Sequence, residues 1–72
     1  MHVFEHNNRL IEVVFVAPAN DDPVRLECTD LRSEMLFDIH RDVVGQLLLR
    51  AFSDRIPLDL IPVVSRIAEE GL

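Results

Sequence analysis

Several residue types are missing or scarce in this 72-residue sequence. It contains no lysine, tryptophan or tyrosine, one cysteine and two glycines. A single cysteine excludes a disulfide framework within the chain, and so few glycines exclude a glycine-rich phosphate loop. No apolar stretch approaches the roughly 20 residues of a membrane-spanning helix, and none has the pattern of a signal peptide. We therefore expect a soluble cytoplasmic protein.

The charge balance is acidic. Thirteen Asp and Glu residues against seven basic ones give a net charge of −6, and every basic residue is an arginine. The arginines are scattered and form no run, whereas binding to a phosphate backbone needs a clustered basic face. Direct binding of nucleic acid is therefore not expected. The use of arginine in place of lysine is typical of a GC-rich bacterial or phage genome.

The length favours one small domain over residues 1–72. A chain this short buries only about 60% of its unfolded surface, so the stability margin is thin. Natural domains of this size often depend on disulfides, a metal or a partner chain. Because disulfides are excluded here, a partner chain deserves consideration.

The longest apolar run of the first half, Leu10–Ala17, has the length and the β-branched content of one strand. The preceding segment His2–His6 reads as a second strand, and Asn7-Asn8 between them tolerates the positive φ of a two-residue hairpin turn. This turn places Phe4 opposite Ile11, on the apolar face that also carries Val13 and Phe15. The sequence therefore predicts an N-terminal β-hairpin.

A second hairpin is expected after a loop at residues 18–23, which is rich in Pro, Asn and Asp. Val24–Thr29 alternates between apolar and polar residues, as a half-buried strand does. A turn centred on Leu31-Arg32 pairs Cys28 with Met35 and Leu26 with Phe37, and it sets Arg25 opposite Asp38. The alternative is a long helix, because Leu31, Met35, Ile39, Val43, Leu47 and Ala51 recur every four residues. The hairpin is the favoured interpretation.

Two helices are expected at the C-terminal end. Asp42 is a credible N-cap for the first, whose apolar stripe comprises Val43, Val44, Leu47, Leu48, Ala51 and Phe52. The second begins near Leu58 or Asp59, tolerates Pro62 near its first turn, and has Gly71 as a plausible C-cap. The predicted fold is thus α+β: a four-stranded antiparallel sheet of two β-hairpins, followed by two C-terminal α-helices.

No combination of residues indicates catalysis or a metal centre. His2 and His6 would lie about 13 Å apart along a strand, too far for one metal ion. Cys28 is expected to be a buried, inert thiol, and the carboxylates read as turn residues, helix caps and ion-pair partners. We therefore predict a protein that is not an enzyme and has no metal, no cofactor and no small-molecule substrate.

An excess of apolar surface is the feature that suggests a function. Leu10, Val14, Val16 and Leu36 would share one sheet face, and this face has no cover if both helices pack on the other side. Leu49, Ile56 and Leu58 add to the surplus. Exposed apolar patches on small proteins are often interfaces, although one helix on each face would also bury these residues. We predict protein–protein association, first as a homodimer through this face or an edge strand.

The alternative is an acidic inhibitor that imitates nucleic-acid phosphates and binds a basic site on a partner protein, as some phage proteins do. It depends on the net charge of −6 alone. It would require carboxylates that gather on one surface, which the sequence does not indicate.

Overall fold

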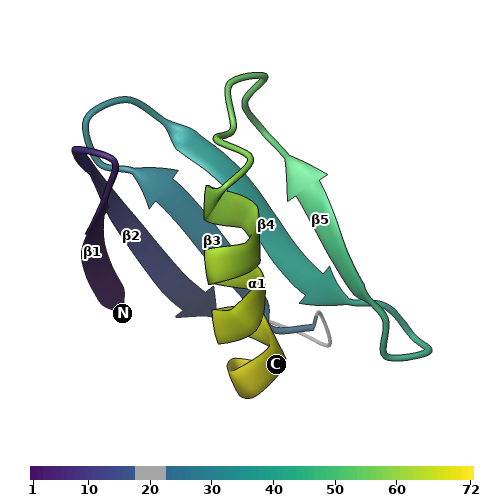
Figure 1. Ribbon diagram of the computed structural model, residues 1–72. Coiled ribbons are helices and arrows are strands. Elements are labelled where there is room, and N and C mark those ends of the chain that lie inside the picture. The colour runs from purple at the N-terminus through teal and green to yellow at the C-terminus, as the bar shows by residue number, and fades with distance from the viewer. Residues whose placement is uncertain (18–22) are drawn as a thin grey trace.

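The computed structural model describes residues 1–17 and 23–72 as a five-stranded antiparallel sheet followed by one helix (Figure 1). The strands β1 (His2–His6), β2 (Arg9–Val16), β3 (Arg25–Asp30), β4 (Met35–Arg41) and β5 (Leu47–Ala51) lie side by side in chain order. The helix α1 (Leu60–Gly71) packs on one face of the sheet. The class is α+β, but the prediction of four strands and two helices is wrong. The loop predicted at residues 18–23 lies almost entirely outside the described residues.

The N-terminal hairpin of β1 and β2 is confirmed, including its register. Phe4 lies opposite Ile11, and His6 lies opposite Arg9. Asn7 and Asn8 have φ angles of 50° and 64°, which match a two-residue turn with both central residues in the left-handed region. Local turn chemistry and the alternation of apolar residues thus specify the same pairing.

The hairpin of β3 and β4 is also confirmed, but its register differs by two residues from the prediction. Cys28 lies opposite Phe37, and Leu26 opposite Ile39. The turn occupies residues 31–34 and is wider than predicted, with the Asp30 N–H donating to the Glu34 carbonyl over 2.9 Å. A β-bulge follows the turn, because Thr29 lies opposite Met35 and leaves Leu36 as an extra residue. Since the shift is an even number of residues, each side chain keeps its predicted face as far as the bulge.

The helix predicted over residues 43–52 is wrong, because this segment is a turn followed by β5. The Asp42 carboxylate does act as a cap, but it accepts hydrogen bonds from the backbone N–H groups of Val44 and Gln46 within the hairpin turn. Gly45 has a φ of +87°, which closes this turn and is unfavourable for other residues. The Asp and Gly signals that permit a helix start therefore specify a β-turn here.

The second predicted helix is confirmed as α1, which buries Leu60, Val64 and Ala68 against the sheet. Gly71 was predicted as the C-cap, but it is the last residue of the helix, and the C-cap is Leu72. A Cβ atom at this position would lie 2.2 Å from Cζ of Phe15 in β2, so the close approach of the helix to this ring requires a glycine. Arg41 at the end of β4 donates from Nε to the Leu72 carbonyl over 2.9 Å. These contacts fix the C-terminal turn of α1 over the sheet.

The core lies between α1 and the sheet. Its fully buried members come from three strands and the helix: Ile11, Val13, Leu26, Cys28, Leu36, Phe37, Ile39, Leu60, Val64 and Ala68. Partly buried Phe4, Phe15, Leu47, Ile56, Ile61, Ile67 and Leu72 surround them. In the part of the chain that the structure describes, no helix has the length and apolar character to cross a membrane.

The core assignment predicts a difference between two neighbouring valines of α1. Val64 is fully buried, whereas Val63 is 42% exposed. Val64→Ala should lower the free energy of unfolding by about 2 kcal/mol, because it leaves a cavity. Val63→Ala removes the same atoms from the helix surface and should change that energy by less than about 0.5 kcal/mol. Urea unfolding followed by circular dichroism measures both, and equal losses would contradict the placement of α1.

Candidate functional site

The four residues predicted to form an interface do not gather on one surface. Leu10 is 39% exposed near the start of β2, and Val14 and Val16 are half-buried farther along this strand. Leu36 is only 1% exposed, because the β-bulge places it in the core beside Phe37. The face opposite α1 therefore offers a short apolar strip on β2 in place of the predicted four-residue patch.

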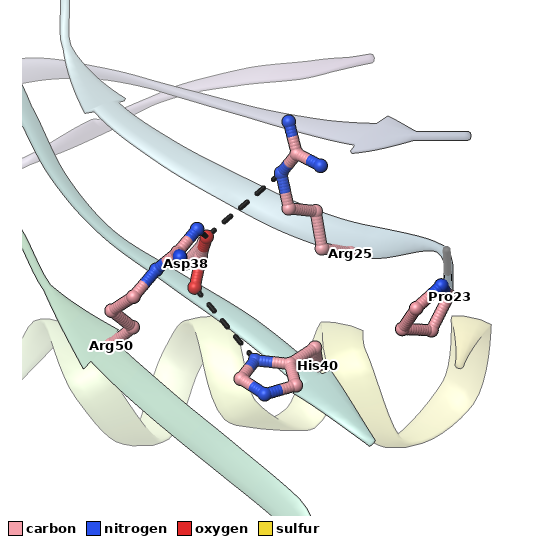
Figure 2. Close-up of a pocket in the computed structure, with 5 residues that line it drawn as sticks. All are labelled: Pro23, Arg25, Asp38, His40 and Arg50. Carbon is pink, nitrogen blue, oxygen red and sulfur yellow. Dashed lines mark hydrogen bonds and ion pairs between the residues drawn. The ribbon is translucent and has the colours of Figure 1, made fainter. Parts of the chain in front are cut away.

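Charged residues occupy the centre of this open face (Figure 2). Asp38 of β4 is fully buried and accepts a hydrogen bond at Oδ2 from Nη2 of Arg50 on β5, over 2.6 Å. Nε of Arg25 on β3 lies 3.9 Å from the same oxygen and donates to Oε2 of Glu27 over 2.9 Å. A buried carboxylate is tolerated only when it is compensated in this way. The cluster therefore has a structural role that links β3, β4 and β5.

A pocket of about 260 Å³ lies beside this cluster, lined by Pro23, Arg25, Asp38, His40 and Arg50 (Figure 2). Within the described residues, Oδ1 of Asp38 has no hydrogen-bond partner, and Nδ1 of His40 lies 3.9 Å away. The pocket thus offers one acceptor among several donors, which suits a small polar group. The two arginines and two carboxylates already neutralise one another, so the pocket has no strong preference for an ion of either sign.

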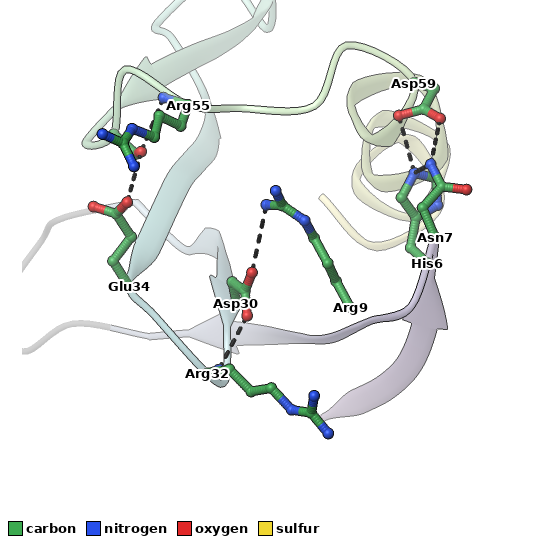
Figure 3. A network of polar contacts seen from close by, with 9 residues as sticks. His6, Asn7, Arg9, Asp30, Arg32, Glu34, Arg55 and Asp59 are labelled. Atoms are coloured by element: carbon green, nitrogen blue, oxygen red, sulfur yellow. Dashed lines mark hydrogen bonds and ion pairs between the residues drawn. The ribbon is translucent and has the colours of Figure 1, made fainter.

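A second set of polar contacts joins the hairpin turns to the segment before α1 (Figure 3). Nε2 of His6 lies 3.1 Å from Oδ1 of Asp59, and Nδ2 of Asn7 donates to Oδ2 over 2.7 Å. The hydrogen bond from His6, followed by that from Asn7, lowers the pKa of Asp59. A lowered carboxyl pKa stabilises the fold at neutral pH, and this contribution is lost as the pH falls through the lowered value. Asp59 therefore anchors the start of α1 without a cap hydrogen bond of its own.

The candidate chemical residues of the sequence lie apart from one another. Cys28 is fully buried in the core, where burial and then the negative charge of Asp30 raise the pKa of its thiol to about 12. His2 and His6 lie on β1, at the opposite edge of the sheet from β5, and His40 lies on β4. Among residues 1–17 and 23–72, no three His, Cys, Asp or Glu side chains are close enough to share a metal ion.

The largest concentration of exposed apolar residues lies on a segment that the sequence interpretation placed in a helix. We call residues 43–52 the apolar arm; it comprises the β4–β5 turn, β5 and Phe52. Five of its large side chains are exposed: Val43 fully, Val44 by 81%, Leu48 by 38%, Leu49 by 41% and Phe52 by 48%. Figure 1 shows β5 at one edge of the sheet, with its turn extending away from α1.

The sequence predicts part of this surface. Of the residues predicted to add exposed apolar area, Leu49 and Leu58 are 41% and 83% exposed, whereas Ile56 is partly buried against the core. Leu48 and Phe52 were expected on the buried side of a helix and are exposed instead. The signal that could have found them is the run Leu47-Leu48-Leu49, which has no helical periodicity of its own, directly after the turn-forming Gly45.

The backbone of β5 presents one row of hydrogen-bonding groups to the sheet and one to the outside. The Phe52 N–H donates to the Leu36 carbonyl over 2.9 Å, and the Gln46 carbonyl accepts from the Asp42 N–H over 3.0 Å. The backbone groups of alternate residues in a strand point in opposite directions, so the N–H and C=O groups of Leu48 and Arg50 also point toward β4. The N–H and C=O groups of Leu47, Leu49 and Ala51 therefore point away from the sheet, at its free edge.

Comparisons with protein-family models, with curated protein sequences and with solved structures found no match.

The burial of Asp38 predicts unequal effects for two arginine substitutions. Arg50→Gln removes the closest partner of a fully buried carboxylate, and Arg25 at 3.9 Å only partly replaces it. We expect the free energy of unfolding to fall by about 2 kcal/mol. Arg55→Gln is the matched control, because Arg55 and its partner Asp54 are both largely exposed and lie 4.0 Å apart. That substitution should change the energy by less than about 0.5 kcal/mol, and an equal effect in urea unfolding would refute a structural role for the cluster.

The raised pKa of Cys28 predicts an unreactive thiol. A shift from 9.0 to about 12 lowers the thiolate fraction near pH 8 by about three orders of magnitude, and burial adds a steric barrier. Because the folded pKa lies above the unfolded one, this residue favours the fold below about pH 9 and loses that contribution as the pH rises toward 12. Labelling with dithionitrobenzoate should be slow in the native protein and fast in guanidinium. The variant Leu58→Cys should label immediately, because Leu58 is 83% exposed and lies outside β5. Prompt labelling of native Cys28 would contradict the burial.

Proposed function

We propose that this protein is a small, non-enzymatic protein–protein interaction domain that self-associates through the apolar arm. The observation that carries the proposal is the state of β5: it is an edge strand in which four of five residues are exposed. An edge strand with free backbone groups and apolar side chains is a template for pairing with another strand. Association through β5 satisfies these groups and removes the exposed leucines from water.

The composition of β5 distinguishes it from a protected edge. Natural edge strands avoid unwanted pairing by means of lysine, proline, inward-pointing charges or a covering element. β5 contains neither lysine nor proline, and its one charged residue, Arg50, is held by Asp38 of its own chain over 2.6 Å. The opposite edge strand, β1, carries Glu5 and two histidines. In a chain with a net charge of −6, residues 43–53 also contain no carboxylate.

The open sheet face is a weaker candidate for the contact. Val14 and Val16 are already half-buried and lie on the face that holds the Asp38 cluster. Covering this face would remove water from Arg25, Glu27 and His40, and desolvation of charged groups opposes association. Pairing along β5 avoids this desolvation cost, so we assign the contact between the two copies to this edge strand.

The acidic-inhibitor alternative has the net charge as its support. Of the described carboxylates, Glu27, Asp30 and Asp38 each lie within 4.0 Å of an arginine, which reduces the negative charge available to a basic partner. Binding that weakens steeply with added salt is the property expected of such an inhibitor. Pairing through an apolar edge should instead change little between low and physiological salt.

The proposal predicts that a charge on the arm abolishes association. In sedimentation equilibrium from low micromolar to near-millimolar protein, the native mass should rise to that of a dimer. Leu49→Lys places a charge at the free edge and should hold the mass at that of a monomer over the whole range. Val3→Lys is the control, because Val3 is 49% exposed on the opposite edge strand and should leave the dimer intact.

Two outcomes would refute this proposal. A native protein that remains monomeric at every concentration would show that the arm does not self-associate. A dimer that survives Leu49→Lys but dissociates in Val14→Asp would place the contact on the open sheet face. Circular dichroism of each variant separates loss of association from loss of the fold.

A further inference from the structure

We infer that two copies of this chain pair β5 with β5 in antiparallel orientation, in the register that sets Leu49 opposite the partner's Leu49. This inference rests on the proposed function and goes further, because it specifies which residues meet. The result would be one continuous sheet across a two-fold axis, in which β1 to β5 of one copy are followed by β5 to β1 of the partner.

The direction of the backbone groups restricts the possible registers. The outward N–H and C=O groups belong to Leu47, Leu49 and Ala51. The backbone groups of Leu48 and Arg50 point toward β4, as the hydrogen bonds at both ends of β5 establish. In an antiparallel pair, residues that exchange hydrogen bonds lie opposite one another. An outward-facing residue must therefore meet another outward-facing residue, so a register that opposes Leu48 to the partner's Leu49 is excluded.

The length of β5 selects among the registers that remain. A two-fold axis through Leu49 pairs all five residues of β5, because Leu47 then meets the partner's Ala51. An axis through Leu48 or Arg50 pairs only three strand residues. An axis through Arg50 also places two arginines directly opposite each other, and like charges in this position are destabilising. The register centred on Leu49 therefore forms the longest ladder without a like-charge pair.

The side chains are compatible with this register on both faces of the sheet. Leu49 lies opposite Ile39 of β4, which is a core residue, so the two Leu49 side chains would meet on the side that carries α1. On the other face, Leu48 would meet the partner's Arg50. Each Arg50 remains bound to Asp38 of its own chain over 2.6 Å, so this pairing leaves no unpaired charge.

Disulfide trapping tests the register. Residues opposite each other in a hydrogen-bonded antiparallel pair have Cα atoms about 5.5 Å apart, within the range of about 4.4–6.8 Å that a disulfide needs. Leu49→Cys should therefore form a covalent dimer under mild oxidation. Leu48→Cys is the control, because two residues of offset would place its two copies about 8 Å apart. We expect the Leu49→Cys chain to cross-link at least about tenfold faster than the Leu48→Cys chain.

A second pair of variants checks the same register at the ends of the strand. Leu47→Cys and Ala51→Cys chains should cross-link to each other when mixed, and neither should cross-link to itself. The native chain should give no covalent dimer, because Cys28 is fully buried and the pKa of its thiol is about 12. All variants are compared by circular dichroism before oxidation.

The outcomes separate this inference from the proposed function. A native dimer with fast self-linking of Leu49→Cys and mixed linking of Leu47→Cys with Ala51→Cys supports both. A native dimer in which Leu48→Cys links to itself faster than Leu49→Cys overturns the register and leaves self-association through β5 standing. A monomer in sedimentation equilibrium overturns the proposed function and this inference with it.

Discussion

The difference in width between one helix and five strands determines how the rest of this molecule is built. Strands spaced about 4.8 Å apart give a five-stranded sheet about 19 Å across, whereas a helix with its side chains is about 10–12 Å wide. α1 can therefore cover the middle of one face only, as Figure 1 shows. The buried residues follow this geometry, since they come from β2, β3, β4 and the helix itself. Within the described chain, most of β5 and the whole opposite face remain without a covering layer.

The two uncovered regions differ in their side chains, since one carries a network of charges and the other carries exposed apolar residues. The opposite face is stabilised by charges, because Arg25 and Arg50 surround the buried carboxylate of Asp38 and Glu27 holds Arg25 in place. Such a network pairs the polar groups of this sheet face without a covering apolar layer. The cost of removing water from its charges also opposes contact with another protein. The apolar arm has no equivalent network, and its Leu48 and Leu49 remain exposed beside free backbone groups. The absence of carboxylates, together with an arginine that is already paired with Asp38, distinguishes this edge.

Local signals in the sequence were enough to predict four of the elements: β1, β2, β3 and α1. Asn7-Asn8 indicated the first hairpin and its register, and the alternation over residues 24–29 indicated β3. The apolar residues expected on the buried side of the helix were Leu60, Ile61, Val63, Val64, Ile67 and Ala68, and of these Val63 is 42% exposed. The remainder depends on long-range packing. The Leu36 bulge could not be read from alternation, because one extra residue turns every preceding side chain to the other face. In the same way, Asp42 and Gly45 suit a helix start or a hairpin turn, and the choice between them depends on whether β4 offers a strand to pair with.

The unequal chemistry of the two sheet edges has a consequence for how large an assembly can grow. A symmetric contact uses the β5 edge of both copies at once, so only the two β1 edges remain at the outer ends. β1 carries Glu5 between His2 and His6, and charged edges resist further pairing. An assembly formed in this way is therefore closed at two chains. A sheet with leucines on both edges would have no such stop, and successive copies could add without limit into a fibre.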